Sequence, residues 1–255
     1  MAMLHTLRHG ADTARPPVLI AHGLFGSARN WGAVARALAA DRLVLAVDMR
    51  NHGHSLRAER HGYAEMAADL AEVAAAQGRP VDLIGHSMGG KAAMRLALER
   101  PGLLRRLAVI DIAPVAYGHT QQGLIDAMRA LDLTGVRARS EADRRLSADV
   151  EDPGVRAFLL QSLDLRADPP GWRLNLDALE ANMPAILGWD GQGRCEAPAL
   201  FLSGGASDYV RPEHRQTIRA LFPAARMAKI PGAGHWLHAD RPEATAGTLR
   251  AFLDA

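Results

Sequence analysis

A serine flanked by glycines is the first group in this chain whose chemistry can be stated from residue types and spacing. The pentapeptide Gly85-His86-Ser87-Met88-Gly89 follows an apolar run at residues 81–84 and precedes a helical stretch that begins near Gly90. A sharp turn between a strand and a helix presents a serine hydroxyl as a nucleophile. Larger side chains two residues before or after the serine would collide with the neighbouring strand and helix, so glycine is needed there. The pattern predicts that Ser87 is the nucleophile of an acyl-transfer reaction.

A serine hydroxyl must be activated by a base within hydrogen-bonding reach. His235 lies in a glycine-rich loop, residues 231–236, directly after the last expected strand. In a parallel sheet, functional side chains gather at the carboxyl ends of the strands. His235 is therefore the predicted base, and His238 is its main rival.

Two aspartates are candidates for the carboxylate that orients this base. Asp111 ends the apolar run at residues 107–110, and Asp208 follows the run at residues 199–202. Either strand end would lie at the edge of the sheet that carries the serine. Spacing alone leaves both acids open.

Acyl transfer also needs hydrogen-bond donors for the oxyanion. The amide of Met88, next to the nucleophile, is the first predicted donor. The second is expected in the loop at residues 22–26, after the first buried strand, from the amide of Leu24, with Phe25 as the alternative. Loss of one such donor typically lowers turnover by about 10²–10³-fold.

The elements that must position these residues are short apolar runs alternating with alanine-rich helical stretches. Apolar residues throughout a strand are typical of a sheet covered on both faces, and the alternation indicates parallel strands. The expected fold is α/β, with a mostly parallel central sheet wrapped by helices. The predicted strands are residues 18–21, 43–47, 81–84, 107–110, 199–202 and 225–230.

The alternation breaks for about 80 residues between two strands that should be neighbours, which is too long for an ordinary crossover. We expect one domain over residues 1–255, with a helical cap inserted at about 116–187, after the strand that ends near Asp111. Within this segment the predicted features are a helical face at Leu124, Met128 and Leu131, a helix capped by Ser140, a helix opened by Asp152 and Pro153, and a helix at 175–187 bent near Pro184.

The amino-acid composition limits which binding partners and which cellular compartment we expect for this protein. Thirty Lys and Arg residues nearly balance 28 Asp and Glu residues, without long blocks of one sign, so neither a nucleic-acid nor a membrane partner is expected. The single cysteine, Cys195, excludes an internal disulfide, and zinc-ligand spacings are absent from the sequence. No apolar run is long enough for a signal peptide or a membrane span, so we expect a cytoplasmic protein.

Taken together, these motifs resemble the α/β-hydrolase superfamily, and more closely its small bacterial YbfF-type esterases. The resemblance covers nearly the whole chain and is weakest in the expected cap. It implies that the acid sits at Asp111, although this sequence also has an acid at Asp208. It further implies that the substrates are esters of short to medium acyl chains, and that thioesters of such chains are also candidate substrates. The matching segments are residues 22–27 (HGLFGS), 47–55 (VDMRNHGHS), 85–91 (GHSMGGK), 110–114 (IDIAP) and 232–236 (GAGHW).

The predicted function is a serine carboxylesterase that needs neither a cofactor nor a metal and acts on a small-molecule ester. Two alternatives stay open: a lyase or carbon–carbon hydrolase on the same fold, and a hydrolase-like ligand receptor. The protein is expected to be a monomer or a small homo-oligomer. The residues predicted to line an acyl pocket are Phe25, Leu124, Met128, Phe158, Trp172, Leu176, Met183 and Trp236.

Overall fold

A seven-stranded sheet forms the centre of the computed structural model, which describes residues 4–255. The strand order is β1-β3-β2-β4-β5-β8-β9, and only β1 runs antiparallel to its neighbour. The strands are β1 (Thr6–His9), β2 (Val18–Ala21), β3 (Val44–Val47), β4 (Val81–His86), β5 (Leu104–Ile110), β8 (Ala199–Gly204) and β9 (Ala225–Ile230).

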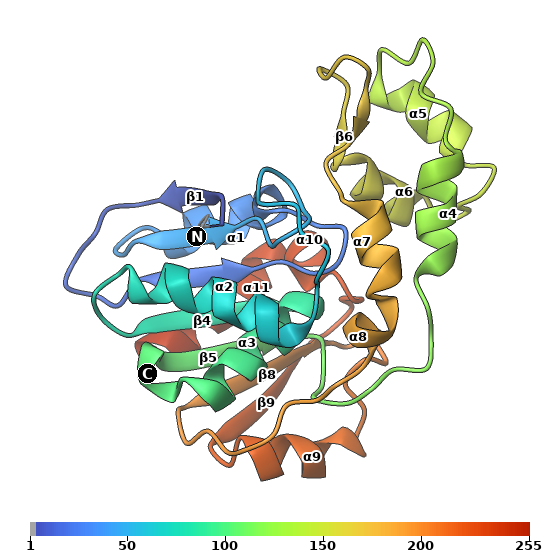
Figure 1. Ribbon diagram of the computed structural model, residues 1–255. Helices are drawn as coiled ribbons and strands as arrows, with labels where there is room; N and C mark the ends of the chain where they lie inside the picture. Colours follow the sequence, from blue (N-terminus) through green and yellow to red (C-terminus); the bar gives the residue numbers. More distant parts are fainter. Residues whose placement is uncertain (1–3) are drawn as a thin grey trace.

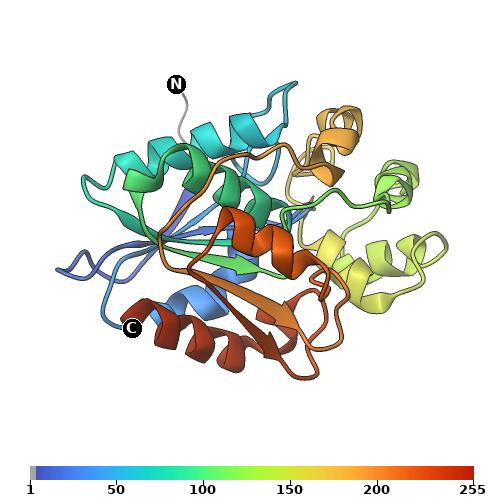
Figure 2. The same ribbon diagram turned by 90° about the horizontal axis from the view of Figure 1, so that it is seen from below.

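Helices cover both faces of this sheet, as Figure 2 shows. One face carries α2 (Tyr63–Ala75), α3 (Met88–Glu99) and α9 (His214–Leu221), and the other carries α1 (Gly32–Leu38), α10 (Leu237–Asp240) and α11 (Pro242–Asp254). Two short 3-10 helices, η1 (Ala28–Trp31) and η2 (Pro101–Leu103), complete the body. Each face buries its own apolar cluster, which explains why the strands are apolar on both sides.

The predicted mostly parallel sheet wrapped by helices is confirmed, and all six predicted strands are present. The two at residues 18–21 and 225–230 have the predicted bounds. The missed strand, β1, is a partly exposed edge strand with mixed polarity, so it lacks the apolar signature used to find the others.

The chain between β5 and β8 forms a group of helices outside the sheet (Figure 1). Asp152 accepts hydrogen bonds from the amides of Gly154 (2.7 Å) and Val155 (3.0 Å), so the predicted start of α6 is confirmed. Ser140 was expected to cap a helix, but α5 already begins at Arg139. The elements are α4 (Gln122–Ala130), α5 (Arg139–Leu146), α6 (Pro153–Leu160), β6 (Leu163–Asp164), β7 (Gly171–Trp172), α7 (Leu176–Ala181) and α8 (Met183–Leu187).

Direct bonds join this helical segment to the loop that follows β3. His52 and Leu174 form an isolated β-bridge, and the Gly53 amide donates to the Arg173 carbonyl at 2.8 Å. The Ser162 hydroxyl donates to the carbonyl of Phe25 at 2.8 Å. The helical segment is therefore attached to the loops that follow β2 and β3.

Within residues 4–255, no helix is both long and apolar enough to span a bilayer.

Candidate active site

Ser87 occupies the turn between β4 and α3, with φ +51° and ψ −120°. This is an unfavourable conformation for a residue with a side chain, and such strain concentrates at functional sites. A Cβ on Gly85 would lie 2.3 Å from the Gly89 carbonyl oxygen, and a Cβ on Gly89 would lie 2.4 Å from that of His22. Glycine is therefore needed at positions 85 and 89, because neighbouring backbone atoms leave no room there for a Cβ atom.

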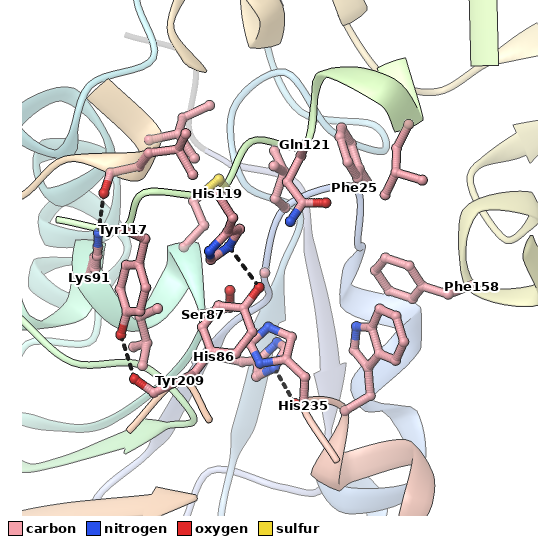
Figure 3. Close-up of a pocket in the computed structure, with 18 of the residues that line it drawn as sticks. Phe25, His86, Ser87, Lys91, Tyr117, His119, Gln121, Phe158, Tyr209 and His235 are labelled. Carbon is pink, nitrogen blue, oxygen red and sulfur yellow. Dashed lines mark hydrogen bonds between the residues drawn. The ribbon is translucent and has the colours of Figure 1, made fainter. Parts of the chain in front are cut away.

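His235 and Asp111 meet at the carboxyl edge of the sheet. His235 Nδ1 lies 2.7 Å from Asp111 Oδ2, and the Asp111 side chain is fully buried at the end of β5. Ser87 and His235 line the same cavity (Figure 3). The structure therefore brings together the three residues proposed from the sequence as nucleophile, base and orienting acid.

The alternative acid, Asp208, lies away from the imidazole. Its side chain is 84% exposed and contacts the guanidinium group of Arg211 at 3.5 Å. The geometry thus favours Asp111 over Asp208 as the partner of His235.

The loop after β8 nevertheless contributes two neighbours of the site that sequence reasoning missed. The Ser207 hydroxyl donates to Asp111 Oδ2 at 2.5 Å, beside the Gly204 amide, which donates to Oδ1 at 3.0 Å. The ring of Tyr209 stacks on the His235 imidazole with a centroid distance of 4.0 Å. The glycine-rich turn at residues 204–208 is the sequence signal for this loop, and its only acidic residue is Asp208.

The loop after β2 is held by a buried histidine from the loop after β3. The Phe25 amide donates to His52 Nε2 at 3.1 Å, while His52 Nδ1 donates to the Arg50 carbonyl at 2.8 Å. Burial holds the pKa of His52 well below its usual value, which keeps this ring neutral and able to accept. Because the Phe25 amide is already bonded, it is a poor candidate for an oxyanion donor.

The amides of Leu24 and Met88 have no hydrogen-bond acceptor within residues 4–255. Met88 is the first residue of α3, where an amide has no partner inside the helix. Both residues line the cavity with Ser87. These two amides are therefore free to bind a negatively charged oxygen.

A cavity of about 340 Å³ opens beside Ser87 and His235. Apolar side chains from the helical segment and the body form most of its wall. Four of the predicted pocket residues line it: Phe25, Leu124, Phe158 and Trp236.

The other four predicted pocket residues lie elsewhere. Met128 and Met183 are buried in the apolar core. Trp172 donates its indole N–H to the Met128 carbonyl at 2.7 Å, and Leu176 packs against the same core. Their apolar character reflects the packing of the helical segment, which the sequence pattern could not distinguish from a pocket wall.

Lys91, one turn after Ser87 on α3, is 1% exposed and lines the same cavity. Its ammonium group donates to the carbonyls of Leu187 (3.0 Å) and Gly188 (2.6 Å) and lies 4.8 Å from the ring centroid of Tyr117. No carboxylate lies within 4.0 Å of it in the part of the chain that the structure describes. Burial lowers the pKa of Lys91 to about 7.

A pH-dependent difference in stability should therefore separate the wild type from Lys91→Met. Between about pH 7 and the unfolded value near 10.5, the unfolded chain binds one more proton than the native chain. The wild type should gain about 1.4 kcal/mol of unfolding free energy per pH unit relative to the variant in this window. Urea unfolding at several pH values above 7 measures this slope, and parallel curves for the two proteins would contradict it.

Comparison with known proteins identifies the family. Residues 18–248 match the alpha/beta hydrolase family. The chain belongs to this family. It is 40% identical to esterase YbfF of Escherichia coli (strain K12) over 243 aligned residues. The alignment covers 93% of each chain.

Two further relatives agree with this assignment. The chain is 41% identical over 252 residues to the mouse (Mus musculus) sn-1-specific diacylglycerol lipase ABHD11, covering 95% of this chain and 82% of the mouse protein. It superposes on a marine microorganism esterase with a TM-score of 0.92 and 35% identity, over 99% of this chain and 100% of the other. The protein is therefore an esterase/lipase-type α/β hydrolase, an enzyme that acts on ester bonds, as its resemblance to the YbfF-type esterases predicted.

Proposed function

We propose that this protein is a cofactor-independent serine carboxylesterase in which Ser87 forms an acyl-enzyme. The observation that carries the proposal is the shared cavity of Ser87 and His235, with His235 Nδ1 held 2.7 Å from the buried carboxylate of Asp111. With Nδ1–H donated to Asp111, the lone pair of His235 Nε2 is available to take the serine proton.

In the first half-reaction, His235 removes the proton of Ser87 as its oxygen attacks the ester carbonyl. The amides of Leu24 and Met88 stabilise the oxyanion that develops. His235 then gives its proton to the leaving alkoxide. Water attacks the acyl-enzyme by the same route and releases the carboxylic acid, while Asp111 stabilises the imidazolium in both steps.

The helical segment at residues 116–187 is proposed to act as a cap that supplies much of the acyl pocket. Leu124, Val155 and Phe158, which belong to α4 and α6, line the same cavity as Ser87. A volume of about 340 Å³ lies near the lower limit of ligand pockets, which run from roughly 300 to 1,000 Å³. The size and the apolar wall favour small to medium acyl groups, including their thioesters.

A panel of p-nitrophenyl esters from acetyl to palmitoyl tests this proposal, with Ser87→Ala as the blank. A diacylglycerol is included because the mouse relative is named for that substrate. We expect kcat/KM to peak at short to medium chains. Equal turnover by wild type and Ser87→Ala would contradict the mechanism, and a maximum at palmitoyl would contradict the proposed pocket.

Two leucine variants test which residues set the acyl preference. Leu124 lines the cavity, whereas Leu131, just after α4, is partly buried against the core and is not among the lining residues. Leu124→Ala should enlarge the pocket and raise relative kcat/KM for longer chains by about tenfold or more, because each methylene bound in an apolar pocket contributes about 1–3 kcal/mol. Leu131→Ala should keep the wild-type profile. Equal shifts in the two variants would place the acyl chain elsewhere.

A further inference from the structure

A second cavity, of about 500 Å³, lies between the body and the helical segment and is lined mainly by charged and polar side chains. Its wall combines η1 and the loop after β3 with the β6–β7 hairpin and the start of α5. Five guanidinium groups surround it, from Arg29, Arg137, Arg139, Arg166 and Arg173.

Two carboxylates line the same cavity, and both already have partners. Asp48 accepts the amides of Ala28 (2.8 Å) and His54 (2.9 Å) and lies 2.9 Å from His5 Nδ1. Asp164 accepts both Nε and Nη2 of Arg173, at 3.0 and 2.8 Å.

In the part of the chain that the structure describes, four of the five arginines therefore have no acidic partner. Of the guanidinium groups in this cavity, only that of Arg173 lies within 4.0 Å of a carboxylate in residues 4–255. Three other arginines of the helical segment are paired: Arg129 contacts Asp177 and Glu180, Arg145 contacts Glu141, and Arg156 contacts Asp143. The cavity thus gathers four guanidinium groups with no carboxylate within 4.0 Å in the described residues 4–255, although Asp48 and Asp164 also line it.

Two of these arginines are fixed in place before any ligand arrives. Arg139 donates to the carbonyls of Leu160 and Leu163, both at 3.0 Å, which leaves its Nη1 available. Arg173 is held by its two bonds to Asp164. A preorganised site loses less side-chain entropy when it binds.

We propose that this cavity binds a dianionic phosphate group, as carried by a phosphate monoester or a diphosphate. Guanidinium groups match phosphate geometry through paired N–H donors, and phosphate offers three or more acceptor oxygens to several arginines at once. A single carboxylate would leave much of the charge on the four arginines without an acidic partner unpaired. The site is distinct from the proposed esterase centre and does not depend on it.

Binding here would tie the helical segment to the body. The anion would bridge Arg29 on η1 to arginines on the opposite wall, near Arg139. The arginine-lined cavity and the cavity beside Ser87 share a wall. Ser162, which lines the first cavity, donates a hydrogen bond to the carbonyl of Phe25, which lines the second. Occupancy should therefore stabilise the junction beside the loop that follows β2.

Calorimetric titration with pyrophosphate at fixed ionic strength tests the proposal. In the first variant, Arg137→Gln and Arg166→Gln are combined, because both side chains are exposed and neither makes a hydrogen bond or ion pair through its guanidinium group within residues 4–255. The control combines Arg100→Gln and Arg219→Gln, two exposed arginines outside the cavity. Both doubles remove the same net charge.

We expect the cavity variant to weaken pyrophosphate binding by about tenfold or more and the control by less than about twofold, since distant surface charges are screened. Thermal unfolding with pyrophosphate should show the same difference in the stabilisation by ligand. A second arm uses phosphatidylcholine vesicles with and without phosphatidic acid. Binding to acidic vesicles that is lost only in the cavity variant would identify a lipid headgroup as the source of the phosphate, and binding of pyrophosphate alone would identify a soluble ligand.

Absence of pyrophosphate binding at millimolar concentration by wild type, together with no cavity-dependent vesicle binding, would overturn the proposal. Equal weakening in the two doubles would also overturn it, because it would reveal diffuse charge attraction rather than a site. Neither result would bear on Ser87, whose acylation is measured separately.

Discussion

Asp111→Asn should lower kcat for a p-nitrophenyl ester by as much as about 10⁴-fold, whereas Asp208→Asn should leave it within about twofold of wild type. An asparagine amide at position 111 can present an N–H to His235 Nδ1, which favours the tautomer with the proton on Nε2. That tautomer has no lone pair to accept the proton of Ser87. Asp208 is solvent-exposed and contacts Arg211, so its charge is not needed by the imidazole.

Steady-state kinetics on both variants checks this expectation, with circular dichroism to show that each is folded. Ser207→Ala serves as an intermediate case, because it removes one donor to the Asp111 carboxylate but leaves the His235 contact and the Gly204 amide in place. Its kcat should fall far less than that of Asp111→Asn. A larger loss in Asp208→Asn than in Asp111→Asn would show that the acid comes from the loop after β8.

Mild acid should unfold this protein because five histidines are buried in the neutral form. Burial lowers the pKa of each, to about 3 for His61 and His238 and well below the usual value for His52 and His86, with His22 lowered as well. Below about pH 6.5 the unfolded chain binds protons that the native chain does not, so stability falls as pH falls. Between pH 7.5 and 5.5, the unfolded imidazole changes from almost fully neutral to almost fully protonated, so each histidine contributes up to about 1.4 kcal/mol and all five up to about 7 kcal/mol. That loss is comparable to the whole stability of an ordinary domain.

Urea unfolding at pH 7.5 and 5.5 measures this loss directly. His238→Phe provides a matched variant, because His238 stacks on Trp31 at a centroid distance of 4.4 Å and its Nδ1 has no hydrogen-bond partner within residues 4–255. The variant should keep the stack and lose one titrating group, so its stability should fall by about 1.4 kcal/mol less than that of the wild type between pH 7.5 and 5.5. Identical slopes for the two proteins would mean that His238 is already protonated when folded.

Much of the site could be predicted because short-range patterns determine it. The glycines around Ser87 report a close approach of backbone, and the position of His235 after the last strand follows from the way a parallel sheet gathers loops at one edge. The buried strands were equally clear, because burial on both faces makes them apolar throughout. Such features need no knowledge of how distant segments pack.

The rest depends on contacts between segments far apart in the chain. Spacing in the sequence could not decide between Asp111 and Asp208, because the choice depends on the directions in which the two side chains point. Those directions are set by the turns after β5 and β8. The partnership of His52 with the Phe25 amide joins two loops 27 residues apart. Only four of the eight predicted pocket residues line the cavity, because its wall also depends on how distant segments pack. Leu124 and Met128 lie on one helix, yet of these two only Leu124 lines the cavity. Helical spacing gives the apolar face but not the partner it contacts.

Intact mass spectrometry after treatment with a fluorophosphonate shows whether Ser87 is a nucleophile activated by His235. We predict a single adduct on wild type, located at Ser87 by peptide mapping, none on Ser87→Ala, and labelling slowed by orders of magnitude on His235→Ala. An adduct on another residue would show that Ser87 is not the nucleophile, and undiminished labelling of His235→Ala would show that His235 does not activate it.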